Sequence, residues 1–298
     1  MARYSLVTVA DSEGAAVAVV LEDRVHPLPG RPSMSALLAD WDTSLERIED
    51  HIRRGDLEPT AAADDARLLA PVPHPPNLYM AGANYADHAR EMRRLPADAP
   101  VPRPETGPFM FLKPTSTVAA HRDHVQIGQG CERVDWEVEL AVVIGRRGRA
   151  VPASDALGYI AGYTVANVVS VRDRFVREDA AEPAMKFDWF LQKGWATSCP
   201  LGPSLVPAGE LPGAQDAAMR LSRNGQVEQD SRTSQMIFSI AEQIAFLSAV
   251  VPLLPGDVIC TGTCAGVGAG KGRYLAPGDV MMAEIEGIGR LENEVVQA

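Results

Sequence analysis

The sequence predicts a mixed, predominantly β fold, with a small α+β N-terminal domain at residues 1–70 and a larger strand-rich domain at 77–298. Two long apolar segments of the larger domain, 134–145 and 156–170, are rich in valine and other residues that favour strands. Strand signals outnumber helix signals along this domain. We therefore expect sheets to dominate it.

Turn and helix signals support the same fold class. Asn224-Gly225 lies between two extended runs and indicates a hairpin turn. The clearest helix is expected at 234–251, where isoleucine and leucine recur at helical spacing. The proline-rich segment 70–76 is typical of a linker between the two domains.

The N-terminal domain combines strands with two short helices. Strands are expected at 4–9 and 15–28, joined by a turn. The second helix is expected to begin at a capping box formed by Thr43 and Glu46 and to end at Gly55.

Composition narrows the functional classes. The chain has 298 residues, 46% of them hydrophobic, and a formal net charge of −11, which gives no support for nucleic-acid binding. No apolar run reaches the length of a membrane helix, and no signal peptide is recognisable, so a cytoplasmic location is expected. The four scattered cysteines are typical of free thiols. The glycine-rich nucleotide-binding patterns are absent from the sequence.

Two glutamates interrupt the apolar segment "VDWEVELAVVIG" at 134–145. Because strand side chains alternate between faces, Glu137 and Glu139 share one face with Ala141 and Val143. Two neighbouring carboxylates in an apolar setting need neutralisation. A divalent cation, lysines or solvent would each provide it.

A histidine and a glutamate in "GANYADHAREM" are three residues apart. On a helix, His88 and Glu91 would share a face, so Glu91 could orient the imidazole and His88 could deprotonate a water. The alternative is an incidental pair on an exposed helix.

Further candidates lie in apolar or small-residue surroundings. Lys113, Arg172 and Lys193 could bind carboxylates, and a buried lysine could stabilise an enolate. Thr263 lies in the small-residue loop "CTGTCAGVG", which could approach a ligand closely. Surface charges and a plain tight turn are the alternatives.

Ordered segments across residues 77–298 resemble the fumarylacetoacetate hydrolase family: "NYADHAREM", "FLKP", "EVELAVVIG", "GYTVANVVSVRD", "QKGWATSCPLGP" and "LLPGDVICTGTCAGVG". The resemblance implies a β-roll catalytic domain, usually in a homodimer with one site per subunit. It also implies Mg²⁺ or Mn²⁺ held by two glutamates and an aspartate. The substrates it implies are small 2-oxo or 1,3-dicarbonyl acids.

Position by position, the resemblance assigns the metal to Glu137 and Glu139, but the family's aspartate falls on Val168. Valine has no donor atom, so the metal is expected to be weakly bound or absent. Without metal, the two glutamates would be protonated, or paired with Lys113, Lys193 or Arg172.

The resemblance assigns catalysis to His88, Glu91 and Lys193, and substrate binding to Tyr85, Lys113, Arg172 and Thr263. It favours hydrolysis of a C–C bond in an acylpyruvate-like acid. A metal-independent lyase, isomerase or cyclase of a specialised pathway remains an alternative, as does a catalytically silent ligand-binding member. The expected partners are the small carboxylate substrate and a second subunit, with no nucleic acid and no membrane.

Overall fold

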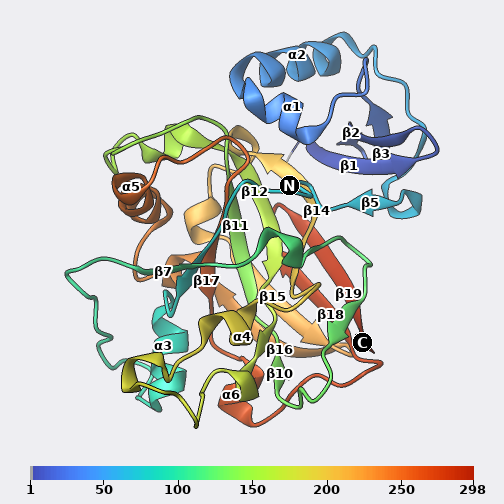
Figure 1. Ribbon diagram of the computed structural model, residues 1–298. Coiled ribbons are helices and arrows are strands. Elements are labelled where there is room, and N and C mark those ends of the chain that lie inside the picture. The colour runs from blue at the N-terminus through green and yellow to red at the C-terminus, as the bar shows by residue number, and fades with distance from the viewer. Residues whose placement is uncertain (1–2) are drawn as a thin grey trace.

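The computed structural model describes residues 3–298 and confirms a mixed, predominantly β fold (Figure 1). A 12-stranded sheet follows the order β4-β3-β2-β1-β14-β12-β11-β17-β6-β7, with β5 paired to β1 and β8 paired to β14. A five-stranded sheet follows the order β16-β15-β18-β19-β9, and β10 and β13 form a two-stranded ribbon.

The N-terminal segment folds as a strand-rich module with two helices. Its elements are β1 (Ser5–Asp11), β2 (Gly14–Leu21), β3 (Arg24–Pro27), α1 (Met34–Ala39), α2 (Trp41–Arg54), β4 (Ala61–Ala62) and β5 (Leu68–Leu69). β1 pairs with β14 of the larger domain at Leu6 and Leu205, so the main sheet extends into the module. The division into separate domains stays a prediction.

Local expectations for this module were partly right. The segment 15–28 is a hairpin rather than one strand, because Glu22 and Asp23 form its turn with positive φ. The capping box at Thr43 was wrong, since α2 already begins at Trp41. Gly55 does end α2 in the left-handed conformation, as expected.

The larger domain contains the remaining elements. Its strands are β6 (Leu78–Gly82), β7 (Phe109–Leu112), β8 (Val118–Ala119), β9 (Val125–Ile127), β10 (Val134–Asp135), β11 (Val138–Ile144), β12 (Ile160–Asn167), β13 (Ser170–Val171), β14 (Cys199–Pro207), β15 (Ala218–Arg223), β16 (Gln226–Arg232), β17 (Val258–Thr263), β18 (Val280–Ile285) and β19 (Gly289–Gln297). Its helices are α3 (Ala86–Arg93), α4 (Trp189–Lys193), α5 (Ile240–Val250) and α6 (Gly268–Lys271).

Two sequence signals of this domain are confirmed with one correction. Asn224 and Gly225, both with positive φ, connect β15 to β16. The helix expected at 234–251 begins later, at Ile240, because Ser239 and Glu242 form a capping box there. No helix within residues 3–298 is long and apolar enough to cross a membrane.

The central strand β11 has two different faces, as its sequence predicted. Val138, Leu140, Val142 and Ile144 belong to the core shared with the five-stranded sheet and α5. On the opposite face, Ala141 and Val143 join a second core, which includes Leu38 and Trp41 of the N-terminal module. Glu137 and Glu139 precede these two residues on that face. The two glutamates therefore lie where the buried apolar residues of this face end and a polar site begins.

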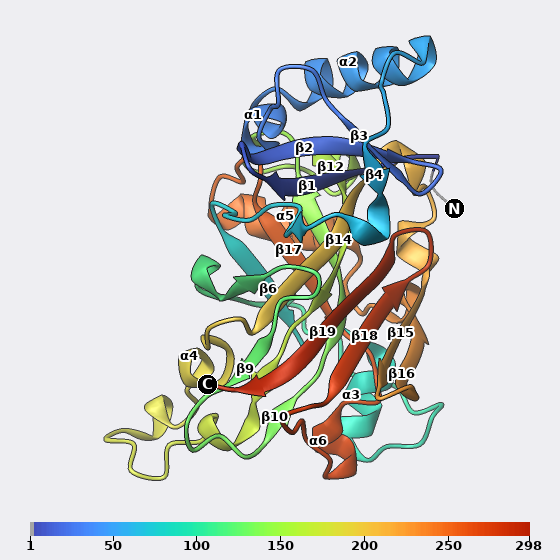
Figure 2. The same ribbon diagram turned by 90° about the vertical axis from the view of Figure 1, so that its right-hand side faces the viewer.

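The site lies at the end of the main sheet away from the N-terminal module. In two perpendicular views, α3, α4 and α6 gather at this end, and the module covers the other (Figures 1 and 2).

Candidate active site

A cavity of about 390 Å³ opens between α3, α4 and the ends of the central strands. It is lined by Ala81, Gly82, Ala83, His88, Met92, Phe111, Arg133, Glu137, Glu139, Arg172, Phe175, Val176, Trp189, Gln192, Lys193, Thr263 and Ala269. The cavity therefore brings His88, both glutamates, Arg172, Lys193 and Thr263 together, although they are far apart in the sequence.

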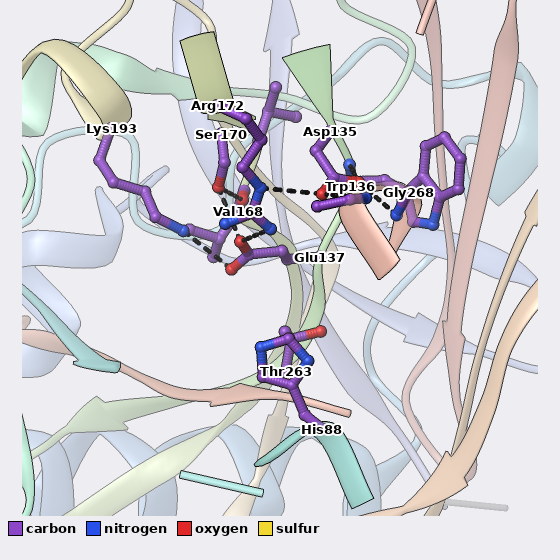
Figure 3. Close-up of polar contacts among 12 residues, drawn as sticks. His88, Asp135, Trp136, Glu137, Val168, Ser170, Arg172, Lys193, Thr263 and Gly268 are labelled. Carbon is purple, nitrogen blue, oxygen red and sulfur yellow. Dashed lines mark hydrogen bonds and ion pairs between the residues drawn. The ribbon is translucent and has the colours of Figure 1, made fainter. Parts of the chain in front are cut away.

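Glu137 is the centre of the polar network (Figure 3). One carboxylate oxygen accepts hydrogen bonds from Ser170 Oγ and Arg172 Nη2, each at 2.7 Å. The other accepts one from Lys193 Nζ at 2.8 Å. Burial alone would raise the pKa of Glu137, but the charges of Lys193 and Arg172 outweigh it and lower the pKa to about 2. Glu137 is therefore ionised and neutralised by two cations.

Arg172 also binds a carboxylate that the sequence analysis missed. Its Nε donates to Asp135 Oδ2 at 2.9 Å. Asp135 is fully buried and accepts backbone hydrogen bonds from Gly268 and Ala269 at the start of α6. Burial raises the pKa of Asp135 despite the nearby guanidinium of Arg172. The alternation of acidic residues at 135, 137 and 139 was the signal that could have revealed Asp135.

Glu139 lies beside this network but has a different environment. Its carboxylate accepts a hydrogen bond from Gly262 N at 2.7 Å. Burial and the neighbouring charge of Glu137 raise the pKa of Glu139 well above its ordinary value. The two carboxyl groups therefore have pKa values displaced in opposite directions, that of Glu137 downward and that of Glu139 upward.

Val168 lies on the same face of the sheet as the two glutamates. β11 and β12 place Val138 opposite Asn167 and Glu139 opposite Ala166, and the Val168 amide donates to the Glu137 carbonyl at 2.8 Å. Residue 168 is therefore opposite Glu137, with its side chain fully buried. Its side chain belongs to the second apolar core and is not among the described residues that line the cavity, and it supplies no oxygen.

The side chains of this site do not fit a three-carboxylate metal centre. Across residues 3–298, no cluster of three His, Cys, Asp or Glu side chains is arranged to hold a metal ion. Both oxygens of Glu137 are engaged by cations, and Val168 has no donor atom. A hard cation such as Mg²⁺ would have to displace these partners and rely mainly on water.

His88 and Glu91 lie on one face of α3, as their spacing predicted. His88 Nδ1 is 3.6 Å from Glu91 Oε2, a contact longer than a hydrogen bond. The Glu91 carboxylate is fixed by the backbone amide of Gly266, which is 3.0 Å from each oxygen. Nδ1 of His88 is buried, and within the described part of the chain it has no hydrogen-bond partner. A small rotation of the imidazole would complete the dyad.

The other predicted site residues take different positions. Thr263 lines the cavity, but its hydroxyl donates to the Val138 carbonyl and accepts from Gln229. Tyr85 is fully buried, and its hydroxyl finds no partner among residues 3–298. Neither Tyr85 nor Lys113 is among the described residues that line the cavity. Their predicted contact with substrate has no counterpart in this geometry.

Lys113 instead connects two segments behind the site. Its ammonium donates to the carbonyls of Ser198 at 2.7 Å and Val169 at 3.3 Å. Ser198 Oγ in turn donates to the Lys193 carbonyl. Burial lowers the pKa of Lys113 to about 8. Lys113 therefore supports the segments that carry Ser170 and Lys193.

Two further lining residues were missed by the sequence analysis. Gln192 is almost fully buried, and its Oε1 has no hydrogen-bond partner in the described chain. Arg133 is exposed at the cavity, with its guanidinium 5.7 Å from the ring centre of Tyr274. No ion pair to Arg133 is formed within residues 3–298. Only its place beside the acidic run could have suggested Arg133.

Known proteins are similar to this chain in sequence and in structure. The model of the fumarylacetoacetate hydrolase C-terminal family matches residues 77–296. The mitochondrial oxaloacetate tautomerase FAHD2A of Bos taurus is 39% identical over 240 residues, which cover 80% of this chain and 72% of that protein.

Two solved structures are also similar. A 5-carboxymethyl-2-hydroxymuconate delta-isomerase from Mycobacterium smegmatis has 33% identity and a TM-score of 0.74, with 99% of this chain and 100% of that chain covered. A maleylpyruvate hydrolase from Sphingobium sp. SYK-6, in complex with manganese(II) and pyruvate, has 26% identity and a TM-score of 0.79, covering 98% and 99%. These relatives are enzymes, which supports an enzymatic role for this chain. The bovine relative is named as mitochondrial, so the cytoplasmic location stays a prediction.

We predict that Asp135→Asn lowers the free energy of unfolding by about 3 to 5 kcal/mol, the usual effect of breaking a buried ion pair. The substitution keeps the size of the side chain but removes the charge that Arg172 faces. Asp230→Asn is the matched control, because its partner Arg220 is exposed and such pairs contribute at most about 1 kcal/mol. Urea unfolding measures both. A loss below about 1 kcal/mol for Asp135→Asn would show that this pair is not structural.

A second prediction concerns the missing metal ligand. Val168→Asp should raise the affinity for Mg²⁺ or Mn²⁺ at least about tenfold, equivalent to about 1.4 kcal/mol, because it places an anionic oxygen opposite Glu137. Val168→Asn is the control with the same shape and no charge, and it should gain less. Calorimetric titration of the three proteins tests this. Equal affinity in all three would mean that residue 168 does not reach the metal.

Proposed function

Because the chain belongs to the fumarylacetoacetate hydrolase family, we propose that it hydrolyses a C–C bond in a small 2-oxo or 1,3-dicarbonyl acid. The observation that carries this proposal is the His88–Glu91 pair, which shares one cavity with the Glu137–Lys193–Arg172 network. Such a reaction needs a general base that activates water and a cationic group that stabilises the enolate, and this cavity contains candidates for both.

The base half of the reaction belongs to His88. Once the imidazole rotates so that Nδ1 donates to Glu91, which is 3.6 Å away, Nε2 of His88 can take a proton from water. The resulting hydroxide adds to the distal carbonyl carbon of the substrate. The bond from that carbon to the neighbouring methylene then breaks, and its electron pair remains on the 2-oxo fragment as an enolate. The proton held by His88 returns to the enolate carbon.

The cationic half stabilises the enolate. Lys193 is nearly buried and donates one hydrogen bond to Glu137, so the other N–H groups of its ammonium are available to an enolate oxygen, sheltered from water. Arg172 is committed to Asp135 and Glu137, and its role is to hold Glu137 rather than the substrate. This revises the expectation that Arg172 grips a carboxylate.

Arg133 is the better candidate for that role. It is a cation at the cavity, and its guanidinium forms no ion pair among residues 3–298. A guanidinium binds a substrate carboxylate through two parallel hydrogen bonds. The unpartnered Oε1 of Gln192 adds an acceptor for a substrate or water proton.

Metal takes no step in this proposal, because the donor set does not fit a tightly held ion. The manganese in the related hydrolase belongs to that protein. For this chain, we expect Mg²⁺ or Mn²⁺ to be weakly bound or absent.

Isomerisation is the second candidate, and the tautomerase and isomerase relatives favour it. It requires only that His88 move a proton between carbons or oxygens, with no attack by water. Product analysis separates the two reactions, since hydrolysis releases two acids and isomerisation conserves the substrate's mass.

The homodimer expected for the family is also a proposal, supported by exposed Phe109 and Leu112 on the edge strand β7.

We predict that His88→Ala lowers kcat by about 2 to 4 orders of magnitude without changing the melting temperature, the usual contribution of a general base. Glu91→Gln should cause part of this loss. His124→Ala is the control, because His124 is exposed and does not line the cavity. Near-normal turnover in both α3 variants would remove the dyad from the mechanism.

A second prediction tests the carboxylate anchor. Arg133→Gln should raise KM about tenfold and leave kcat within about twofold, because the anchor is made equally in the ground and transition states. Arg220→Gln, a change at an exposed ion pair outside the cavity, should leave both constants unchanged. An unchanged KM in Arg133→Gln would place the substrate carboxylate elsewhere.

A further inference from the structure

A second cavity of about 200 Å³ adjoins the active site on the other side of His88. The two cavities share Gly82, Ala83, His88 and Met92. A substrate held at the cationic end, with its distal carbonyl beside His88, would therefore extend into this second cavity. Nothing in the proposed reaction requires the space beyond His88.

The second cavity is mainly apolar. Its lining away from the shared residues consists of Asn84, Ala89, Arg93, Pro102, Pro104, Gly107, Phe109, Ile237 and Phe238. The amide of Asn84 is saturated, since it bonds Phe238 twice through the backbone and the Thr261 carbonyl once. Arg93 is an exposed residue in the last turn of α3. The wall that a ligand would contact in this cavity is therefore mostly carbon and has few hydrogen-bond donors.

The outer wall is held in place by α5 and the segment before it. Arg103 donates to the Ile237 carbonyl and to Glu242 Oε1, and its guanidinium lies 4.3 Å from the ring centre of Phe238. Gly107 has φ of +96°, and a side chain there would meet the ring of Phe246 at 2.7 Å. The proline-rich wall is therefore docked closely on the helix. The cavity exists before a ligand arrives.

We infer that this cavity is a subsite for an apolar group on the distal carbonyl of the substrate, so that the enzyme takes 2,4-dioxo acids with uncharged acyl tails. The inference rests on the proposed function, since it assumes that the distal carbonyl lies beside His88. Burial of each CH₂ group from water favours binding. A second carboxylate in the same place would lose its water without a buried partner.

The size of the cavity sets the range of tails. An apolar protein cavity of roughly 150 Å³ accepts a benzene molecule. A tail of four or five carbons is of that order and fits in about 200 Å³. The bovine relative is named for oxaloacetate, which carries two carboxylates. We therefore infer that this chain differs from that relative in its substrate. At the end remote from the 2-oxo acid, the substrate of this chain carries an apolar tail in place of a carboxylate.

The test compares three 2,4-dioxo acids, with acetyl, pentanoyl or succinyl as the acyl group. Pentanoyl and succinyl tails have similar lengths and differ in the terminal carboxylate. The value of kcat/KM for the pentanoyl compound should exceed that for each of the other two by at least about tenfold, since a few methylene groups in a fitted pocket give discrimination of this order. Preference for the succinyl compound would overturn the inference and indicate that Arg93 binds a second carboxylate.

A matched pair of variants locates the effect. Ala89 lines only the second cavity, so Ala89→Leu should reduce the pentanoyl-to-acetyl ratio of kcat/KM to about 1. Ala86→Leu adds the same side chain to the same helix outside both described cavities, and it should leave the ratio unchanged. Melting temperatures establish that both variants fold. An unchanged ratio in Ala89→Leu would overturn the inference.

Binding separates this inference from the proposed reaction. If no compound is hydrolysed but calorimetry shows at least about tenfold tighter binding of the pentanoyl acid, the hydrolase proposal fails and the subsite stands. If all three are hydrolysed at similar kcat/KM, the hydrolase stands and the subsite fails. If none binds, both fail.

Discussion

Two cations meet on one buried carboxylate, and the rest of the active site depends on this contact. Glu137 holds Lys193 at one oxygen and Arg172 at the other, so three segments that are distant in sequence are fixed at one point. Burying this many charges is favourable only if each has a partner at hydrogen-bond distance. Asp135 provides the second partner of Arg172 and also fixes the start of α6. This network of ion pairs therefore fixes the start of α6 as well as the side chains that face the cavity.

The same contact accounts for the poor fit of this site to a metal ion. A residue without donor atoms stands opposite Glu137, and the space beside the carboxylate is used by cationic side chains. In the proposed reaction, the positive charge at this point comes from Lys193 and Arg172, which pair with Glu137. Activity that depends on these two side chains would not be lost on treatment with a chelator.

Much of the fold and part of the site could be predicted from the sequence. Alternation along β11 correctly separated the two glutamates from the apolar face, because strand periodicity is a local property. The resemblance correctly identified the family, because several ordered motifs are hard to produce by chance. Pairing of Glu137 with Lys193 and Arg172 was among the stated alternatives. The sequence could not select it, because these residues are far apart in the chain and only the folded structure brings them together. Lys113 could not be placed, since an apolar flank is equally compatible with lining a cavity and with supporting it from behind.

The two-faced character of β11 has a consequence for how this architecture can be divided. The family match begins at residue 77, yet the core beneath Ala141 and Val143 is completed by Leu38 and Trp41 of the first module. An isolated fragment starting at the family boundary would leave that apolar surface in water, only a few residues along the strand from Glu137 and Glu139. The module therefore covers the apolar part of the same strand whose first residues lead into the active site. If such modules were exchanged between relatives, the new module would have to cover these apolar residues as well, so the two parts are expected to evolve together.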